Sequence, residues 1–196
     1  MGRWMPITAT VGCCAGIAIA LFPAAAAARS CRATTPAIAS PELQQFDVEA
    51  FGITLEIPSN YRSMLRSSGH ITFHDPNSFS FIQCLARTGE YGQVPPYVVL
   101  EVHPAVDRTR PLVELIRERR PWLDYYSPEY IDFEFSGQAA VRYTYFNEIY
   151  RLEIANVTFL AEDGRTLLTL AGPAEHPIMV NVLNMPATNL SDLQIQ

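Results

Sequence analysis

Two histidines, His70 and His74, form the first pattern in this sequence that could do chemistry. Their H-x-x-x-H spacing is typical of helical zinc sites, in which the two rings lie about 6 Å apart on one face. Here the β-branched Ile71 and Thr72 separate them, which favours a strand. On a strand the two side chains would lie roughly 13 Å apart, so one ion could not bridge them. We therefore expect no metal site and no cofactor.

The arginines Arg117, Arg119 and Arg120 form a basic cluster on an acidic chain. The sequence has 14 Lys and Arg against 20 Asp and Glu, a net charge of −6. The cluster is a candidate surface for an acidic protein partner. The alternative is a solvated helix end that the helix dipole favours. The negative net charge argues against nucleic-acid binding.

The stretch after this cluster, 122–135, mixes acidic and aromatic side chains. One interpretation is a surface that binds a cation or a protein partner. The other is a loop followed by one half-exposed strand, because Ile131, Phe133 and Phe135 alternate with Asp132 and Glu134.

The first 28 residues are typical of an export signal. Arg3 gives a basic start, no charge occurs from Trp4 to Ala28, and Ala26-Ala27-Ala28 suits a signal peptidase. The uncharged run could also stay as a membrane anchor. We expect cleavage and a mature chain that begins near Arg29, is not inserted in a membrane, and lies in a periplasm, a thylakoid lumen or the extracellular space.

Only Cys31 and Cys84 remain after cleavage. Two cysteines in an exported protein predict one disulfide bond. The alternative is an unpaired Cys31 and a buried thiol at Cys84.

Catalytic motifs are missing from the mature sequence. It contains no G-x-S-x-G, no Gly-rich phosphate loop, no H-E-x-x-H and no C-x-x-C. A triad could still assemble from distant residues, because such sites are defined by geometry. We expect a protein that is not an enzyme, with a small exported hydrolase or ligand-binding protein as the alternative.

The stretch Ala139–Gly172 predicts three antiparallel strands joined by two tight turns. Asp163-Gly164 is typical of a type I′ turn, which would pair Phe159 with Leu168 and Val157 with Leu170.

A first turn centred on Asn147-Glu148 would pair Tyr145 with Tyr150 and Tyr143 with Leu152. The two registers place opposite faces of the middle strand inward. We expect a bulge near Ala155-Asn156 to reconcile them, or else a middle strand buried on both faces.

The rest of the chain predicts several short strands and two helices. Strands are expected at 46–50, 53–57, 71–74, 79–86, 97–103 and 131–135, with helices after Pro111 and from Pro177. This order predicts an α+β fold with a largely antiparallel β-sheet flanked by helices. The expected organisation is a signal peptide (1–28), a flexible linker (29–45), a single α+β domain (46–190) and a tail (191–196).

Two short stretches carry a family resemblance. Phe51-Gly-Ile-Thr-Leu-Glu-Ile-Pro58 is followed by Ser59-Asn60-Tyr61, and Gly137-Gln138-Ala139-Ala140 heads a strand that leads into a hairpin. With the order of elements, these stretches resemble the PsbP-like family. That family has an α-β-α sandwich, shared with a nuclear-transport factor that binds the Ran GTPase and with bacterial exported lipoproteins.

The resemblance implies an accessory or assembly protein that binds a protein partner, for example at a photosynthetic membrane complex. It supplies no functional residue for this sequence. The oligomeric state is not indicated by either the residues or the resemblance.

Overall fold

The computed structural model describes residues 30–33 and 35–184, and every structural statement below concerns these residues. The expected signal peptide and the expected tail lie outside them. Within this part of the chain, no helix is long and apolar enough to cross a membrane.

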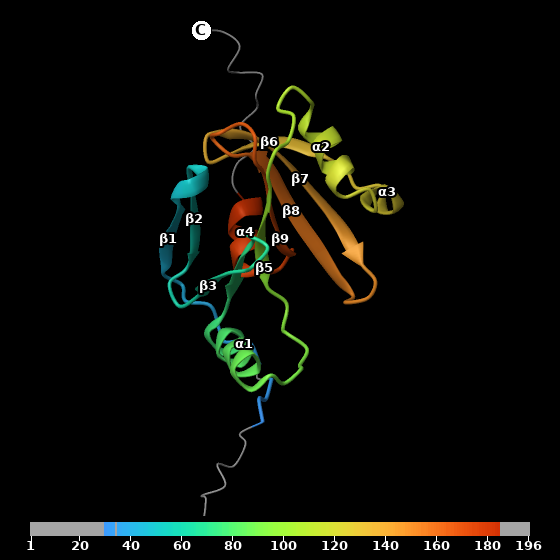
Figure 1. Ribbon diagram of the computed structural model, residues 1–196. Helices are drawn as coiled ribbons and strands as arrows, with labels where there is room; N and C mark the ends of the chain where they lie inside the picture. Colours follow the sequence, from blue (N-terminus) through green and yellow to red (C-terminus); the bar gives the residue numbers. More distant parts are fainter. Residues whose placement is uncertain (1–29, 34, 185–196) are drawn as a thin grey trace, which may run out of the picture. The chain divides into compact units, whose positions relative to one another are not determined.

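The described chain forms a seven-stranded antiparallel sheet in the order β3-β4-β5-β9-β8-β7-β6, and a separate β1-β2 hairpin (Figure 1). The strands are β1 Leu43–Val48, β2 Ile53–Pro58, β3 Arg62–Leu65, β4 Ile71–His74, β5 Val98–His103, β6 Ile131–Phe135, β7 Gln138–Asn147, β8 Leu152–Leu160 and β9 Leu167–Pro173. The helices are α1 Pro76–Thr88, α2 Leu112–Arg119, α3 Leu123–Tyr126 and α4 Pro177–Leu183. This confirms the expected α+β class.

One face of the large sheet carries the main hydrophobic core. Alternate residues of the central strands, among them Leu100, Val157 and Leu168, are fully buried there. Helix α4 and the β1-β2 hairpin pack on this face through residues such as Ile57 and Ile178. Both expected helices, α2 and α4, are present, and α4 begins at Pro177 as expected.

Helices α2 and α3 cover part of the opposite face, where Ile116 and Leu123 pack on Val141 and Tyr143. The stretch of strand β8 from Ala155 to Phe159 is therefore covered on both sides, and all of its residues are fully buried. Its pairing with β7 and β9 is continuous. The expected bulge is therefore wrong, and the alternative of a strand buried on both faces is confirmed.

The segment expected as a strand at 79–86 is part of helix α1. Asp75 is its N-cap and accepts hydrogen bonds from the backbone N–H groups of Asn77 (3.0 Å) and Ser78 (3.2 Å). Pro76 occupies the first helical position, where its missing N–H costs nothing. The Asp75-Pro76 pair is thus the start signal of a helix.

The β8-β9 hairpin has the expected register, with Phe159 opposite Leu168 and Val157 opposite Leu170. The expected turn type is wrong. Gly164 has φ 62° and donates to the carbonyl of Ala161, but Asp163 does not share the positive φ that a type I′ turn requires. The Asp163 carboxylate instead accepts hydrogen bonds from the backbone N–H groups of Arg165 (2.7 Å) and Thr166 (2.8 Å).

The β7-β8 hairpin differs from its expected register by four residues, since Tyr145 lies opposite Ile154 and not Tyr150. The Asn147 side chain accepts hydrogen bonds from the N–H groups of Ile149 and Tyr150 (both 3.1 Å), which stabilises a longer loop. Because the displacement is even, every side chain keeps its face of the sheet.

The segment expected as a linker is attached to the domain. Strand β1 begins at Leu43, three residues before the expected start. Upstream, the N–H of Ala37 donates to Asp75 (2.7 Å), and a disulfide joins Cys31 to Cys84 with a Cα–Cα distance of 5.7 Å. The predicted disulfide pairing is confirmed.

Candidate functional site

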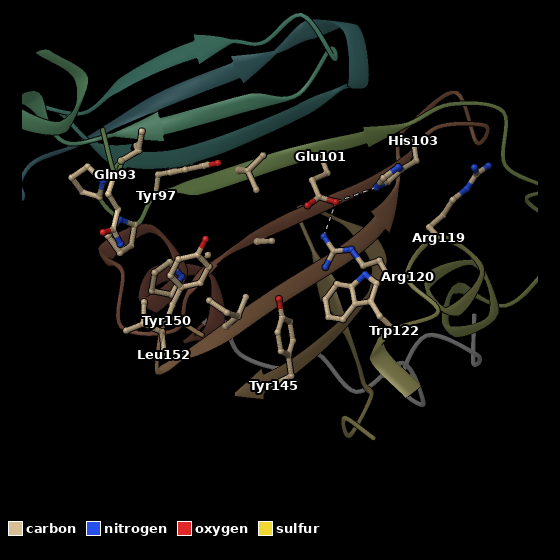
Figure 2. A pocket seen from close by; sticks show the side chains of 18 residues that line it. Gln93, Tyr97, Glu101, His103, Arg119, Arg120, Trp122, Tyr145, Tyr150 and Leu152 are labelled. Carbon is tan, nitrogen blue, oxygen red and sulfur yellow. Dashed lines mark hydrogen bonds and ion pairs between the residues drawn. The ribbon is translucent and has the colours of Figure 1, made fainter. Parts of the chain in front are cut away.

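A cavity of about 660 Å³ lies on the sheet face that α2 and α3 cover only in part (Figure 2). We call it the open-face cavity. Its floor is formed by alternate residues of β5, β9 and β8, and its sides by the segment 93–97, the corner between α2 and α3, and the end of the β7-β8 hairpin. Its lining residues include Tyr97, Val99, Glu101, Arg119, Trp122 and Tyr150.

Aromatic side chains dominate the sides of the open-face cavity. Trp122 packs edge-on against Tyr145 with ring centroids 5.1 Å apart, and Tyr126 lies 5.1 Å from Tyr145. Tyr150 and Trp122 remain 59% and 45% exposed. Exposed aromatic groups beside a hollow are typical of a binding surface, because each would lose contact with water when a ligand enters.

At one end of the cavity, Arg120 makes a buried network with the sheet. Its Nη2 donates to Glu101 Oε2 (2.6 Å), and its Nη1 donates to Asn156 Oδ1 (2.6 Å) and to the Tyr143 hydroxyl (3.3 Å). We call these four residues the Arg120 network. Arg120 is only 7% exposed. A buried guanidinium is tolerated only when its donors are satisfied in this way.

The Glu101 carboxylate is held in its charged form. Burial alone would raise the pKa of Glu101, but a hydrogen bond from His103 (3.2 Å) and the Arg120 guanidinium outweigh it and lower the pKa to about 2. Figure 2 shows Glu101 between these two partners. The carboxylate is thus a permanently charged acceptor at neutral pH.

The local sequence explains why Arg120 turns inward. Pro121 cannot continue α2, so the helix ends at Arg119, and Arg120 follows with φ −135°, while its N–H still donates to Ile116 (2.8 Å). This places its side chain against the sheet. Glu101 reaches the same face because it alternates with the inward Leu100 on β5.

The three arginines of the expected basic cluster do not share one surface. Arg117 pairs with Asp124 (3.7 Å) and lies over the Tyr130 ring (5.4 Å). Arg120 is buried in the sheet. Arg119 is exposed, lines the open-face cavity, and forms no ion pair with any residue that the structure describes. Of the three candidate residues, only Arg119 can therefore offer a free charge to a ligand in the cavity.

His70 and His74 serve separate structural contacts. His74 ends strand β4, as the sequence predicted, and its Nε2 lies 2.8 Å from the Thr72 hydroxyl. Burial and the nearby Arg66 lower its pKa to about 4. His70 Nδ1 accepts the backbone N–H of Val102 (3.0 Å). Among the residues that the structure describes, no three possible metal ligands lie together.

Sequence reasoning missed Glu101, Tyr143 and Asn156. The available signal was a polar residue within an otherwise apolar strand, in YVVLEVH for Glu101 and in LEIANVTFL for Asn156. A buried polar residue in such a strand needs a partner, which here is Arg120. The described residues that line the open-face cavity include no serine, threonine or cysteine.

Comparison of the chain with known proteins adds no assignment. No protein-family model matches it, and no curated protein shows significant similarity.

Proposed function

We propose that this protein is an exported binding protein, not an enzyme, and that the open-face cavity holds a segment of a protein partner. The observation that carries the proposal is the cavity itself. It is open to solvent and has aromatic sides, and among the described residues that line it Arg119 is the cation without an ion pair, beside a network of satisfied polar groups. The resemblance to the PsbP-like family agrees with an accessory or assembly role.

The polar groups of the cavity support binding rather than turnover. Arg120 donates to three acceptors, and Glu101 accepts from Arg120 and His103, so these groups stabilise each other. A general acid or base needs a pKa near the working pH, whereas the pKa of Glu101 is about 2.

The disulfide supports the proposed export, because such bonds persist in a periplasm, in a thylakoid lumen or outside the cell. The proposed oxidising compartment is also where the proposed partner would be found. A partner at the outer side of a membrane would meet the mature domain there.

A second candidate is a small-molecule binding protein. The volume of about 660 Å³ falls within the range of ligand sites, about 300–1,000 Å³, and the lining is mostly apolar with polar groups at one end. Native mass spectrometry of protein purified from its host tests this candidate, since a retained small molecule would add a discrete mass.

Co-purification from the source cells tests the main proposal. Val99 is half-buried in the cavity floor, so Val99→Trp should fill the cavity and reduce recovery of the partner. Tyr150→Ala should also reduce it, because Tyr150 is exposed at the rim and its loss leaves the core unchanged.

Val180→Trp is the matched control, because Val180 is 38% exposed on α4, which packs on the other face of the sheet. Thermal unfolding would establish that all variants fold. Equal recovery of the partner with wild type, Val99→Trp and Tyr150→Ala would overturn the proposal.

A further inference from the structure

We infer that the occupant of the open-face cavity is an extended, acidic-and-apolar peptide segment, with its carboxylate at Arg119 and a large apolar side chain near Tyr97 and Tyr150. This inference rests on the proposed function and names the chemistry of the segment that the cavity would hold.

The charge of the cavity selects an anion. Its charged lining residues are Glu101, Arg119 and Arg120, and the first and last neutralise each other at 2.6 Å. Arg119 therefore leaves a net positive charge in a cavity on a protein whose net charge is −6. An acidic group would meet attraction here and repulsion over much of the remaining surface.

The opposite end of the cavity selects an apolar group. Figure 2 shows Tyr97, Tyr150 and Leu152 on the side away from Arg119 and Arg120. Tyr97 is 37% exposed and Tyr150 is 59% exposed, so both rings are free to contact a ligand. An aliphatic or aromatic side chain placed between them would bury its own surface and theirs.

The length of the cavity floor favours an extended backbone for the bound peptide. The positions of Tyr97 and Glu101 are four residues apart along the direction of β5, which is about 13 Å at ~3.3 Å per residue. Side chains four residues apart on an extended peptide point to the same side. Figure 2 shows Arg119 beyond Glu101 on the side away from Tyr97, so the acid and the apolar side chain should be separated by at least three residues.

Two synthetic pentapeptides test the inference, both acetylated and amidated: Phe-Thr-Val-Thr-Asp and Phe-Thr-Val-Thr-Lys. Binding to the mature protein is measured by fluorescence anisotropy of labelled peptide at low and high salt. The Asp peptide should bind about tenfold more tightly than the Lys peptide at low salt, and the ratio should shrink at high salt.

Arg119→Glu should reverse this preference. Arg117→Glu is the matched control, since Arg117 lies on the same helix but pairs with Asp124 and does not line the cavity. It should leave the preference unchanged.

Equal binding of both peptides, no binding of either, or an equal effect of the two arginine changes would overturn the inference. These results would leave the proposed function standing if Val99→Trp still reduced recovery of the partner. If Val99→Trp had no such effect, the proposed function itself would fail.

Discussion

Arg120 is the residue that fixes the corner between α2 and α3 to the sheet. Its guanidinium donates hydrogen bonds to Glu101, Asn156 and Tyr143 in place of water. It also lies 5.9 Å from the centre of the Trp122 ring, which helps to hold one side of the open-face cavity. A buried ion pair of this kind contributes less through its own strength than through the cost of breaking it.

Arg120→Leu should lower the free energy of unfolding by about 3 kcal/mol, because it leaves Glu101 and Asn156 without their buried donor. Chemical denaturation measures the change. Arg119→Leu serves as the control and should change stability by less than about 0.5 kcal/mol, as is usual for an exposed site. Equal effects of the two substitutions would contradict the Arg120 network.

The buried His74 and the partly buried His176 should make the stability of the fold sensitive to mild acid. Burial lowers the pKa of His74 to about 4, with Arg66 acting in the same direction and Asp75 opposing it, and burial lowers the pKa of His176 to about 4. Each should bind its proton in the unfolded chain near pH 6.5 but in the folded protein only near pH 4. The unfolded state then binds more protons in this window, so stability is full above about pH 6.5 and falls toward pH 4.

The free energy of unfolding, measured from pH 7 to pH 4, should therefore decrease by up to about 1.4 kcal/mol per pH unit for each histidine. In His74→Gln the decrease should be shallower, because one of the two proton sites is gone. A profile of the same steepness in both proteins would contradict the assignment to His74. The depressed pKa of Glu101 acts only below about pH 4.5, so it lies outside the upper part of this window.

The hairpins and helices are where local sequence signals succeeded or failed. The β8-β9 register followed from apolar pairing, which is a property of both strands together. The predicted β7-β8 register was wrong because the side chain of Asn147 stabilises a longer loop than the predicted two-residue turn. The prediction of a strand where helix α1 lies was wrong because an Asp-Pro pair can begin either a turn or a helix. The contacts of Asp75 with Ala37 and Ser78 decide for the helix.

Gly164 carries the element-scale prediction for the β8-β9 hairpin. Gly164→Val should lower the free energy of unfolding by about 1–3 kcal/mol, because a β-branched residue tolerates φ 62° poorly. An added Cβ would meet Arg108 only at 3.5 Å, so backbone conformation and not space is the cause. Gly164→Asn should lower the free energy of unfolding much less, since asparagine adopts a positive φ more readily than valine does. Equal denaturation midpoints for all three proteins would contradict the positive φ.

At the scale of the whole molecule, the α+β class and the disulfide followed from the sequence, but the open-face cavity did not. The class follows from the order of short strands and helices, and the pairing from the two cysteines that follow a stretch typical of an export signal. The cavity depends on β5 lying beside β9, a long-range pairing that no local pattern encodes. It also depends on Arg120 turning away from the other two arginines, which requires a partner on β5.

The disulfide closes a large loop, since its cysteines are 53 residues apart. Replacing both cysteines by serine should lower the free energy of unfolding by roughly 4 kcal/mol, because the unfolded chain regains the freedom that the bond removes. Denaturation of the purified, unreduced protein with and without reductant gives the same comparison. Two free thiols in denatured, unreduced protein would contradict the bond.

Site-specific photo-crosslinking in the source cells tests the central claim most directly. A benzophenone amino acid at Tyr150 stands at the rim of the open-face cavity, and one at Leu65, which is 73% exposed on strand β3, reports background. We predict a discrete protein adduct at position 150 that disappears when Val99→Trp is added, and no such adduct at position 65. Adducts at both positions, or an adduct at position 150 that persists with Val99→Trp, would contradict binding in the cavity.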